Sequence, residues 1–155
     1  VNIYNGTITS WRDGNPIRRI LRPDTDSDWH LLYSLSPDLA KALETALATE
    51  GLFMAVTDTD AISYLERIPG SFGTSTLTMI LAEKRHVKIL SFNGIQPGVA
   101  EPDKEKYPLE KPYYLLARAE PSKPVESFIE FSRSDEGQRI LTQVGLVPDS
   151  ETPIP

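Results

Sequence analysis

The stretch 22–29 holds the residue types best suited to chemistry in this chain. One arginine is followed by alternating aspartates and small hydroxyl residues, in the order Arg22, Asp24, Thr25, Asp26, Ser27, Asp28. Ser27 and Asp28 are residue types that cap helix N-termini. A helix that begins there directs free backbone N–H groups and the positive end of its dipole into the turn. The stretch is therefore a candidate anion site, or else a capped polar loop without a ligand.

A second turn of this kind lies at Thr57 and Asp58. The short apolar run 52–56 before it predicts a buried strand, and a helical pattern follows it. In α/β proteins ligands bind at turns between a strand and the N-terminus of the next helix. Thr57 and Asp58 are therefore further candidate ligand contacts, although helix capping alone would also explain both.

The aspartates also invite a calcium hypothesis. Asp24, Asp26 and Asp28 match the first, third and fifth positions of an EF-hand loop. Trp29 stands where that loop needs glycine, and Leu35 stands where it needs a bidentate glutamate. These two mismatches argue against an EF-hand and leave only an unspecific cation site open.

No pattern of residues predicts catalysis. Nothing in the sequence places either histidine, His30 or His86, beside a nucleophile, and a structural or solvent-exposed role explains each. Nucleophile-elbow, phosphate-loop and zinc-protease motifs are missing from the sequence. We expect a protein that is not an enzyme and that needs no cofactor or metal.

Composition narrows the classes of protein further. The chain has 155 residues, the size of one ordinary domain, and a formal charge of −6. This acidic balance argues against a nucleic-acid surface. Without cysteine the chain has neither disulfides nor thiolate chemistry.

The order of apolar segments predicts an α/β fold with a largely parallel or mixed sheet, because strands alternate with helices. Helices are expected after the capped turns, with Ser36 as the N-cap of one and Pro37 at its first position. The segments 96–106 and 149–155 are predicted to be a loop and a tail. The predicted strands are 17–21, 52–56, 87–92 and 113–117.

Six blocks of sequence, in order, resemble a known family. The first reads Tyr-Asn-Gly-Thr-Ile-Thr-Ser-Trp, similar to that family's entry segment, and the third contains Pro-Gly-Ser-Phe-Gly. The fourth contains Phe-Asn-Gly-Ile-Gln-Pro, and the fifth Tyr-Pro-Leu-Glu-Lys-Pro-Tyr-Tyr. The chain resembles the phosphate-binding proteins of ABC importers, which are type-2 periplasmic binding proteins, over residues 4–148. The blocks are Tyr4–Trp11, Ile17–Asp28, Arg67–Gly73, Lys88–Pro97, Tyr107–Tyr114 and Phe128–Gln138.

The resemblance implies a non-catalytic binding component of an ABC importer, with phosphate or a related oxyanion held at helix N-termini between two lobes. Arg22 and Asp24 stand where the family has its anion-binding arginine and a carboxylate. The residues 25–28 replace the family's Gly-Ser-Gly-Thr, so two aspartates, Asp26 and Asp28, stand near the expected anion. Their charges would repel a dianion in a dry cleft. A different ligand, a bound cation or a lost binding function are the alternatives, and the last corresponds to a sensor or interaction module.

The resemblance also implies how the chain is divided and where it works. Residues 1–107 would form the second lobe, with a sheet flanked by helices, and residues 112–148 would supply a strand and helices to the first lobe. Since the chain begins with Val1, we expect it to be the C-terminal part of a longer protein. The apolar faces of residues 112–146 would then need cover, which predicts a homodimer or a domain swap. Importer membrane subunits are the expected partners, and the location would be periplasmic or otherwise extracytoplasmic.

Overall fold

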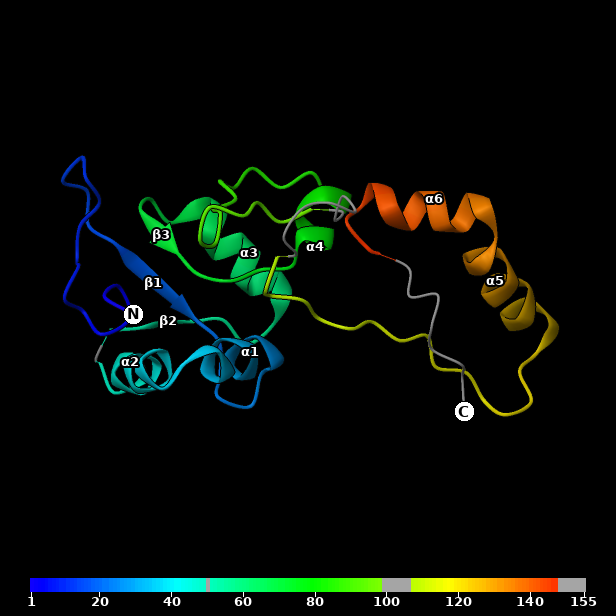
Figure 1. The fold of residues 1–155 in the computed structure, drawn as a ribbon, viewed down its shortest axis with the longest axis horizontal. Helices are drawn as coiled ribbons and strands as arrows, with labels where there is room; N and C mark the ends of the chain where they lie inside the picture. Colours follow the sequence, from blue (N-terminus) through cyan, green and yellow to red (C-terminus); the bar gives the residue numbers. More distant parts are fainter. Residues whose placement is uncertain (50, 99–106, 148–155) are drawn as a thin grey trace. The chain divides into compact units, whose positions relative to one another are not determined.

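The computed structural model describes residues 1–49, 51–98 and 107–147 (Figure 1). The chain divides into two compact units, Val1–Lys88 and Ile89–Pro155. The predicted tail 149–155 and most of the predicted loop 96–106 lie outside the described residues. In the described part, no helix has the length and apolar character needed to cross a bilayer.

The first unit is built on a small parallel sheet with strand order β2-β1-β3. The central strand β1, Arg18–Leu21, pairs with β2, Phe53–Met54, and with β3, Ser71–Phe72. The α/β prediction with a largely parallel sheet is confirmed. Strand β2 is shorter than the predicted 52–56, and both its residues are exposed, so the prediction of a buried strand there was wrong.

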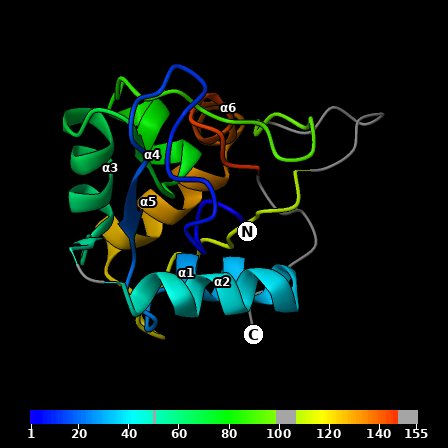
Figure 2. The same ribbon diagram turned by 90° about the vertical axis from the view of Figure 1, so that its left-hand side faces the viewer.

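Consecutive residues of β1 point to opposite faces of the sheet and so serve two cores. Leu21 lies in a cluster with Trp29 and Leu43, under helices α1, Ser27–Leu35, and α2, Pro37–Leu47. Ile20 packs on the other face, against Ala55 and the residues of helix α3, Asp58–Arg67. Helices thus cover both faces of the sheet (Figures 1 and 2). The two apolar clusters hold β1 in the middle of the unit.

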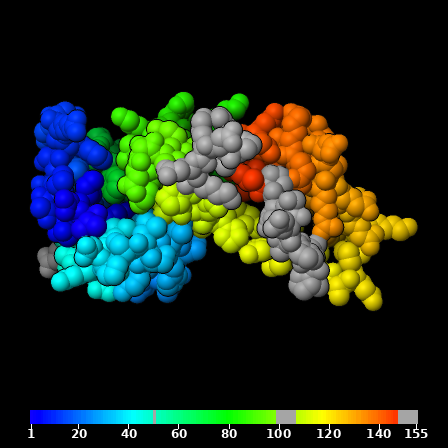
Figure 3. Space-filling view, in the orientation of Figure 1, coloured from blue at the N-terminus to red at the C-terminus, as the bar shows by residue number. Residues whose placement is uncertain are grey.

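Polar caps set where these helices begin. The Ser36 side chain accepts a hydrogen bond from the Leu39 N–H, and Pro37 occupies the first turn of α2, as predicted. Thr57 caps α3 in a reciprocal capping box with Asp60, which confirms one of the two predicted caps. Packed side by side, α1 and α2 present one continuous surface (Figure 3).

A tight turn at Gly70 connects α3 to β3. Gly70, with φ of 72°, follows α3, and its carbonyl accepts hydrogen bonds from the Trp11 indole and from the Arg18 backbone N–H. A side chain at Gly70 would collide with the Pro16 carbonyl, so this turn requires glycine. Helix α4, Leu77–Ala82, begins after Thr76, whose side chain accepts a hydrogen bond from the Met79 N–H.

The second unit contains two helices in its described residues. They are α5, Lys123–Arg133, and α6, Asp135–Gln143, which contact each other and lie adjacent in the space-filling view (Figure 3). The Ser134 hydroxyl accepts a hydrogen bond from the Gly137 N–H and caps α6. Asn93 and Gly94, both with positive φ, form a turn between Phe92 and Ile95.

Two predicted strands are missing. Residues 87–92 contain no strand, and Phe92 makes only an isolated bridge to Ile95. Residues 113–117 likewise lie outside any helix or strand. The first prediction rested on the alternating pattern of residues 87–92, and the second on the apolar run that follows Pro112. A strand also needs a neighbouring strand for its backbone hydrogen bonds, and composition does not supply one.

Candidate functional site

The carboxyl edge of the sheet brings together the two turns that sequence predicted as ligand sites. Arg22 directly follows β1, and its Nη1 donates a hydrogen bond of 3.1 Å to the Ala55 carbonyl beyond β2. The Ala55 N–H donates to the Leu21 carbonyl at 2.9 Å, which continues the pairing of the two strands. The N-termini of α1 and α3 therefore meet at Arg22, from opposite faces of the sheet.

Arg22 is buried and bonded to two carboxylates. Its Nη2 lies 2.6 Å from Asp26 Oδ2 and 2.8 Å from Asp58 Oδ1. Asp26 is the N-cap of α1, and Asp58 is the first residue of α3. One guanidinium thus bridges two helices whose starts are 32 positions apart in the chain, counted from Asp26 to Asp58. Residues 22, 26 and 58 of the predicted site are in direct contact.

The Asp26 carboxylate uses both of its oxygens. Oδ2 accepts from Arg22, and Oδ1 accepts the Asp28 backbone N–H at 2.8 Å. The cap of α1 is therefore Asp26, and the prediction that Ser27 or Asp28 caps this helix was wrong by one or two positions. Aspartate serves as well as serine at this position, because either can accept a bond from the N–H two or three residues ahead.

The local charge is negative. Burial by itself lowers the pKa of Arg22, but its hydrogen bond to Asp26 and the charges of Asp26, Asp58 and Asp28 outweigh burial and raise it. Asp28 is itself buried. Burial, with a further contribution from the Asp28 charge, raises the pKa of Tyr4. Three carboxylates thus act on one guanidinium, which leaves a formal charge of about −2 around Arg22.

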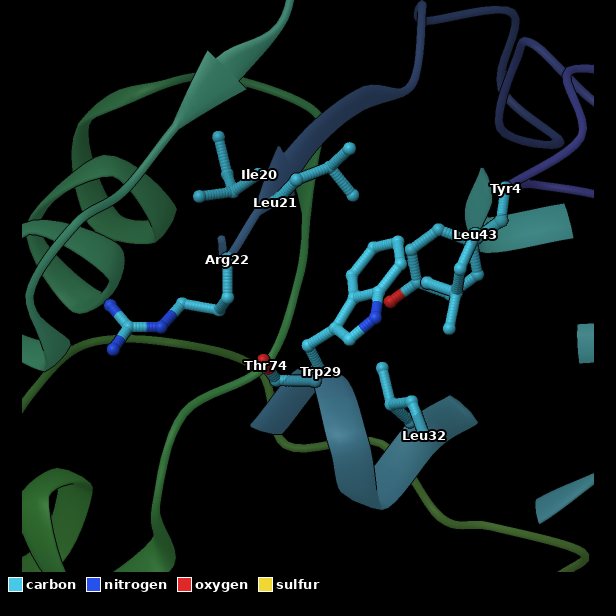
Figure 4. A pocket seen from close by; sticks show the side chains of 8 residues that line it. All are labelled: Tyr4, Ile20, Leu21, Arg22, Trp29, Leu32, Leu43 and Thr74. Atoms are coloured by element: carbon cyan, nitrogen blue, oxygen red, sulfur yellow. The ribbon is translucent and has the colours of Figure 1, made fainter. Parts of the chain in front are cut away.

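A small cavity lies beside this cluster. Its wall includes Arg22, Trp29 and Thr74, together with apolar side chains from both the sheet and the helices (Figure 4). The Arg22 side chain extends away from the indole of Trp29 (Figure 4). The cavity measures about 10 Å³, about the space that one water molecule needs. The cavity is therefore too small for a solute larger than water.

Two buried side-chain atoms in the described part of the chain have no hydrogen-bond partner: Arg22 Nε and Ser75 Oγ. Ser75 belongs to the segment that follows β3. This segment passes close to β1, as shown by Gly73, where an added Cβ would lie 2.8 Å from the Ile20 carbonyl oxygen. Sequence reasoning missed Ala55, Thr74 and Ser75. The Phe-Gly pair before Thr74, in a block that resembles the family, was the available signal for this segment.

The remaining predicted residues lie around the cluster. Asp24 and Ser27 are exposed, and the contacts that the structure gives for Arg22 do not include either. Thr57 is exposed, and its hydroxyl contacts Asp60 in the capping box. Among the described residues, no group of three or more histidine, aspartate or glutamate side chains has an arrangement that could hold a metal ion.

A parallel sheet with helices on both faces, whose strand-to-helix turns meet at its carboxyl edge, defines an α/β architecture in which ligands bind at that edge. The family model described as "PBP superfamily domain" matches residues 1–136, and the chain belongs to this family of periplasmic binding protein-like domains. Such domains are generally extracytoplasmic and bind solutes. The search of curated proteins and the search of solved structures found no match.

Proposed function

We propose that this chain is part of the solute-binding component of an ABC importer, works outside the cytoplasm and has no catalytic activity. The solute would be held at the carboxyl edge of the sheet, over Arg22 and the starts of α1 and α3. The observation that carries this proposal is the burial of Arg22 at the edge where two helix N-termini meet. Family membership supports a solute-binding role.

The family resemblance makes phosphate or a related oxyanion the first solute to test. Backbone N–H groups at a helix N-terminus and a guanidinium are suitable donors for oxyanions. Asp58, Thr57 and Ser27 would stand at the rim of the site. The carboxylates bound to Arg22 oppose the binding of an oxyanion.

Thermal melting of the chain with a panel of solutes tests the proposal. The panel contains phosphate, sulfate, molybdate, neutral polar solutes, amino acids and divalent cations. A bound ligand at about 100 times its Kd stabilises the folded state by about 2.7 kcal/mol. We expect one solute to raise the Tm, and Arg22→Ala to abolish that rise while the exposed Asp24→Ala keeps it. A rise that survives Arg22→Ala would place the site elsewhere.

A second candidate function is a sensor or interaction module with a degenerate ligand site. The observation that favours it is that Asp26 and Asp58 already occupy Arg22. An unchanged Tm with every solute of the panel would favour this second function over transport.

We propose two kinds of partner: the importer's membrane subunits and a second copy of the chain. The lobe division at residues 107 and 112 is part of this proposal. Several large apolar side chains of the second unit are exposed, among them Phe128 and Phe131 on α5 and Tyr114 and Leu116 before it. Sedimentation at micromolar concentration should detect a homodimer or domain swap, and a monomer would exclude it.

A further inference from the structure

The Asp26 carboxylate is bound by the same groups that bind external anions at helix N-termini, which are a backbone N–H and a guanidinium. One oxygen accepts a backbone N–H at the start of α1, at 2.8 Å, and the other accepts Arg22 Nη2, at 2.6 Å. Helix N-termini and guanidinium groups capture carboxylates and phosphates through such bonds. The side chain of Asp26 is only 19% exposed, so water screens this contact weakly.

Asp58 adds a second internal anion on the same nitrogen of Arg22, at 2.8 Å. The two carboxylates come from the starts of helices on opposite faces of the sheet, and together they exceed the charge of the guanidinium. Asp28, also buried, adds to the negative potential. An oxyanion that approached Arg22 would meet this excess, and repulsion between unit charges near a protein surface is strong at distances of about 4 Å.

One nitrogen of the buried Arg22 side chain is not used by the resident carboxylates. The side chain is 94% buried, as the complement of its 6% exposure, and Nε has no hydrogen-bond partner in the described part of the chain. The guanidinium therefore keeps an unused N–H in a site that is otherwise closed by Asp26 and Asp58. The other two nitrogens, Nη1 and Nη2, already donate to the Ala55 carbonyl and to Asp26 and Asp58, so the resident carboxylates hold the place that an external oxyanion would take.

We propose that Asp26 is a resident anion which, assisted by Asp58, determines specificity by excluding phosphate, sulfate and similar dianions from Arg22. This inference rests on the proposed function and narrows its solute to one without net negative charge. It also names the change that would convert the site, which is removal of the Asp26 charge with the helix cap retained. Asp26 is thus an autoinhibitory group toward oxyanions.

Asp26→Ser makes that change, because serine is an N-cap residue type and carries no charge. We expect phosphate or sulfate at millimolar concentration to raise the Tm of Asp26→Ser, with chloride of equal ionic strength as the reference for general salt effects. In calorimetry the variant should bind phosphate at least about tenfold more tightly than the unaltered chain. The matched control is Asp24→Ser, which makes the same change of charge at an exposed position and should behave like the unaltered chain.

Asp58→Asn provides a second variant that leaves the Thr57 cap of α3 in place. It should also gain affinity for phosphate, and it keeps the test valid if Asp26→Ser does not fold. Equal binding of phosphate to the unaltered chain and to Asp26→Ser would overturn the inference while supporting a solute site. The inference would also be overturned if both variants fold and neither binds phosphate more tightly than the unaltered chain. A gain in a chain that binds no solute in its unaltered form would support the inference and count against the proposed function.

Discussion

The two units of the chain differ in what their apolar residues pack against. All the buried apolar side chains of the described residues lie in the first unit, on both faces of its sheet. In the second unit, among the described residues, Gly137 alone is buried. Phe128 there is 59% exposed and Leu116 is 93% exposed. Amphipathic helices thus occur in both units, but among the described residues only the first unit contains a sheet.

This difference shows that an amphipathic sequence determines which face of a helix is apolar, but does not determine what that face packs against. Helices α2 and α5 both have an apolar stripe and a polar face. The stripe of α2 lies in a core with Leu21 and Trp29, whereas α5 has Val125, Phe128 and Phe131 exposed. Exposed apolar surface of this extent is typical of an interaction face.

The largest effect should come from separating the units. We expect residues 1–88 alone to melt cooperatively, because their two clusters are internal to them. Residues 89–155 alone should show no cooperative melting, because their described helices bury almost no apolar surface. Circular dichroism during heating measures both. Cooperative melting of 89–155 would break the comparison by showing that this unit has a core of its own.

The next effect is a contrast between two apolar truncations. Leu43→Ala removes a side chain that is 1% exposed and should destabilise the chain by about 2–5 kcal/mol. Phe128→Ala should cost less than about 1 kcal/mol, as expected for a largely exposed position. Urea unfolding measures both. An equally large cost for Phe128→Ala would mean that α5 is covered in solution, by another copy or by other residues.

Ion pairs offer a smaller contrast. Arg22→Ala leaves Asp26 and Asp58 without their shared partner and should cost roughly 2–3 kcal/mol, a value below that of a fully buried pair because Asp58 is 45% exposed. Arg139 pairs with Glu136 at 2.6 Å on the surface of α6, and Arg139→Ala should leave the free energy of unfolding nearly unchanged. Similar costs for the two variants would contradict the burial of the Arg22 cluster.

The smallest effect concerns acid stability. The hydrogen bond from the His86 backbone N–H, together with Arg85, lowers the pKa of Glu66 below its usual 4.5 despite the opposing effect of burial. A carboxyl whose pKa is lowered by folding stabilises the protein above its unfolded pKa, and this contribution is lost as the pH falls through the lowered value. Glu66→Gln should therefore reduce the Tm at neutral pH and have less effect at acid pH. A Tm difference that does not depend on pH would exclude this role of the charge.

Local chemistry made part of the fold predictable. The caps at Ser36 and Thr57 depend on a side chain and an N–H three residues ahead, so the sequence contains both partners. The run 17–21 was recognisable as a strand from its apolar residues, two of which, Ile20 and Leu21, are buried on opposite faces of the sheet. The runs 87–92 and 113–117 also looked like strands in the sequence. A strand must pair with another strand far away in the chain, and the sequence does not show which strand that is or in which register the two would pair.

The candidate site was predictable to a similar degree. That the turns after two strands meet follows from parallel pairing, so Arg22, Asp26 and Asp58 could be chosen together. Their bonds could not be foreseen, because which carboxylate reaches the guanidinium depends on the exact start of each helix. The shift of the α1 cap to Asp26 is what brings one of its oxygens to Arg22.

The bridge from Arg22 to Asp26 and Asp58 also has a mechanical consequence. Arg22 Nη2 bonds Asp26 at the start of α1 and Asp58 at the start of α3. Fraying of either helix start would therefore break a bond to the same guanidinium. Motions at the starts of the two helices are therefore coupled across the edge of the sheet. An event that draws Arg22 away breaks both contacts together, while the caps of α1 and α3 by Asp26 and Thr57 do not depend on Arg22.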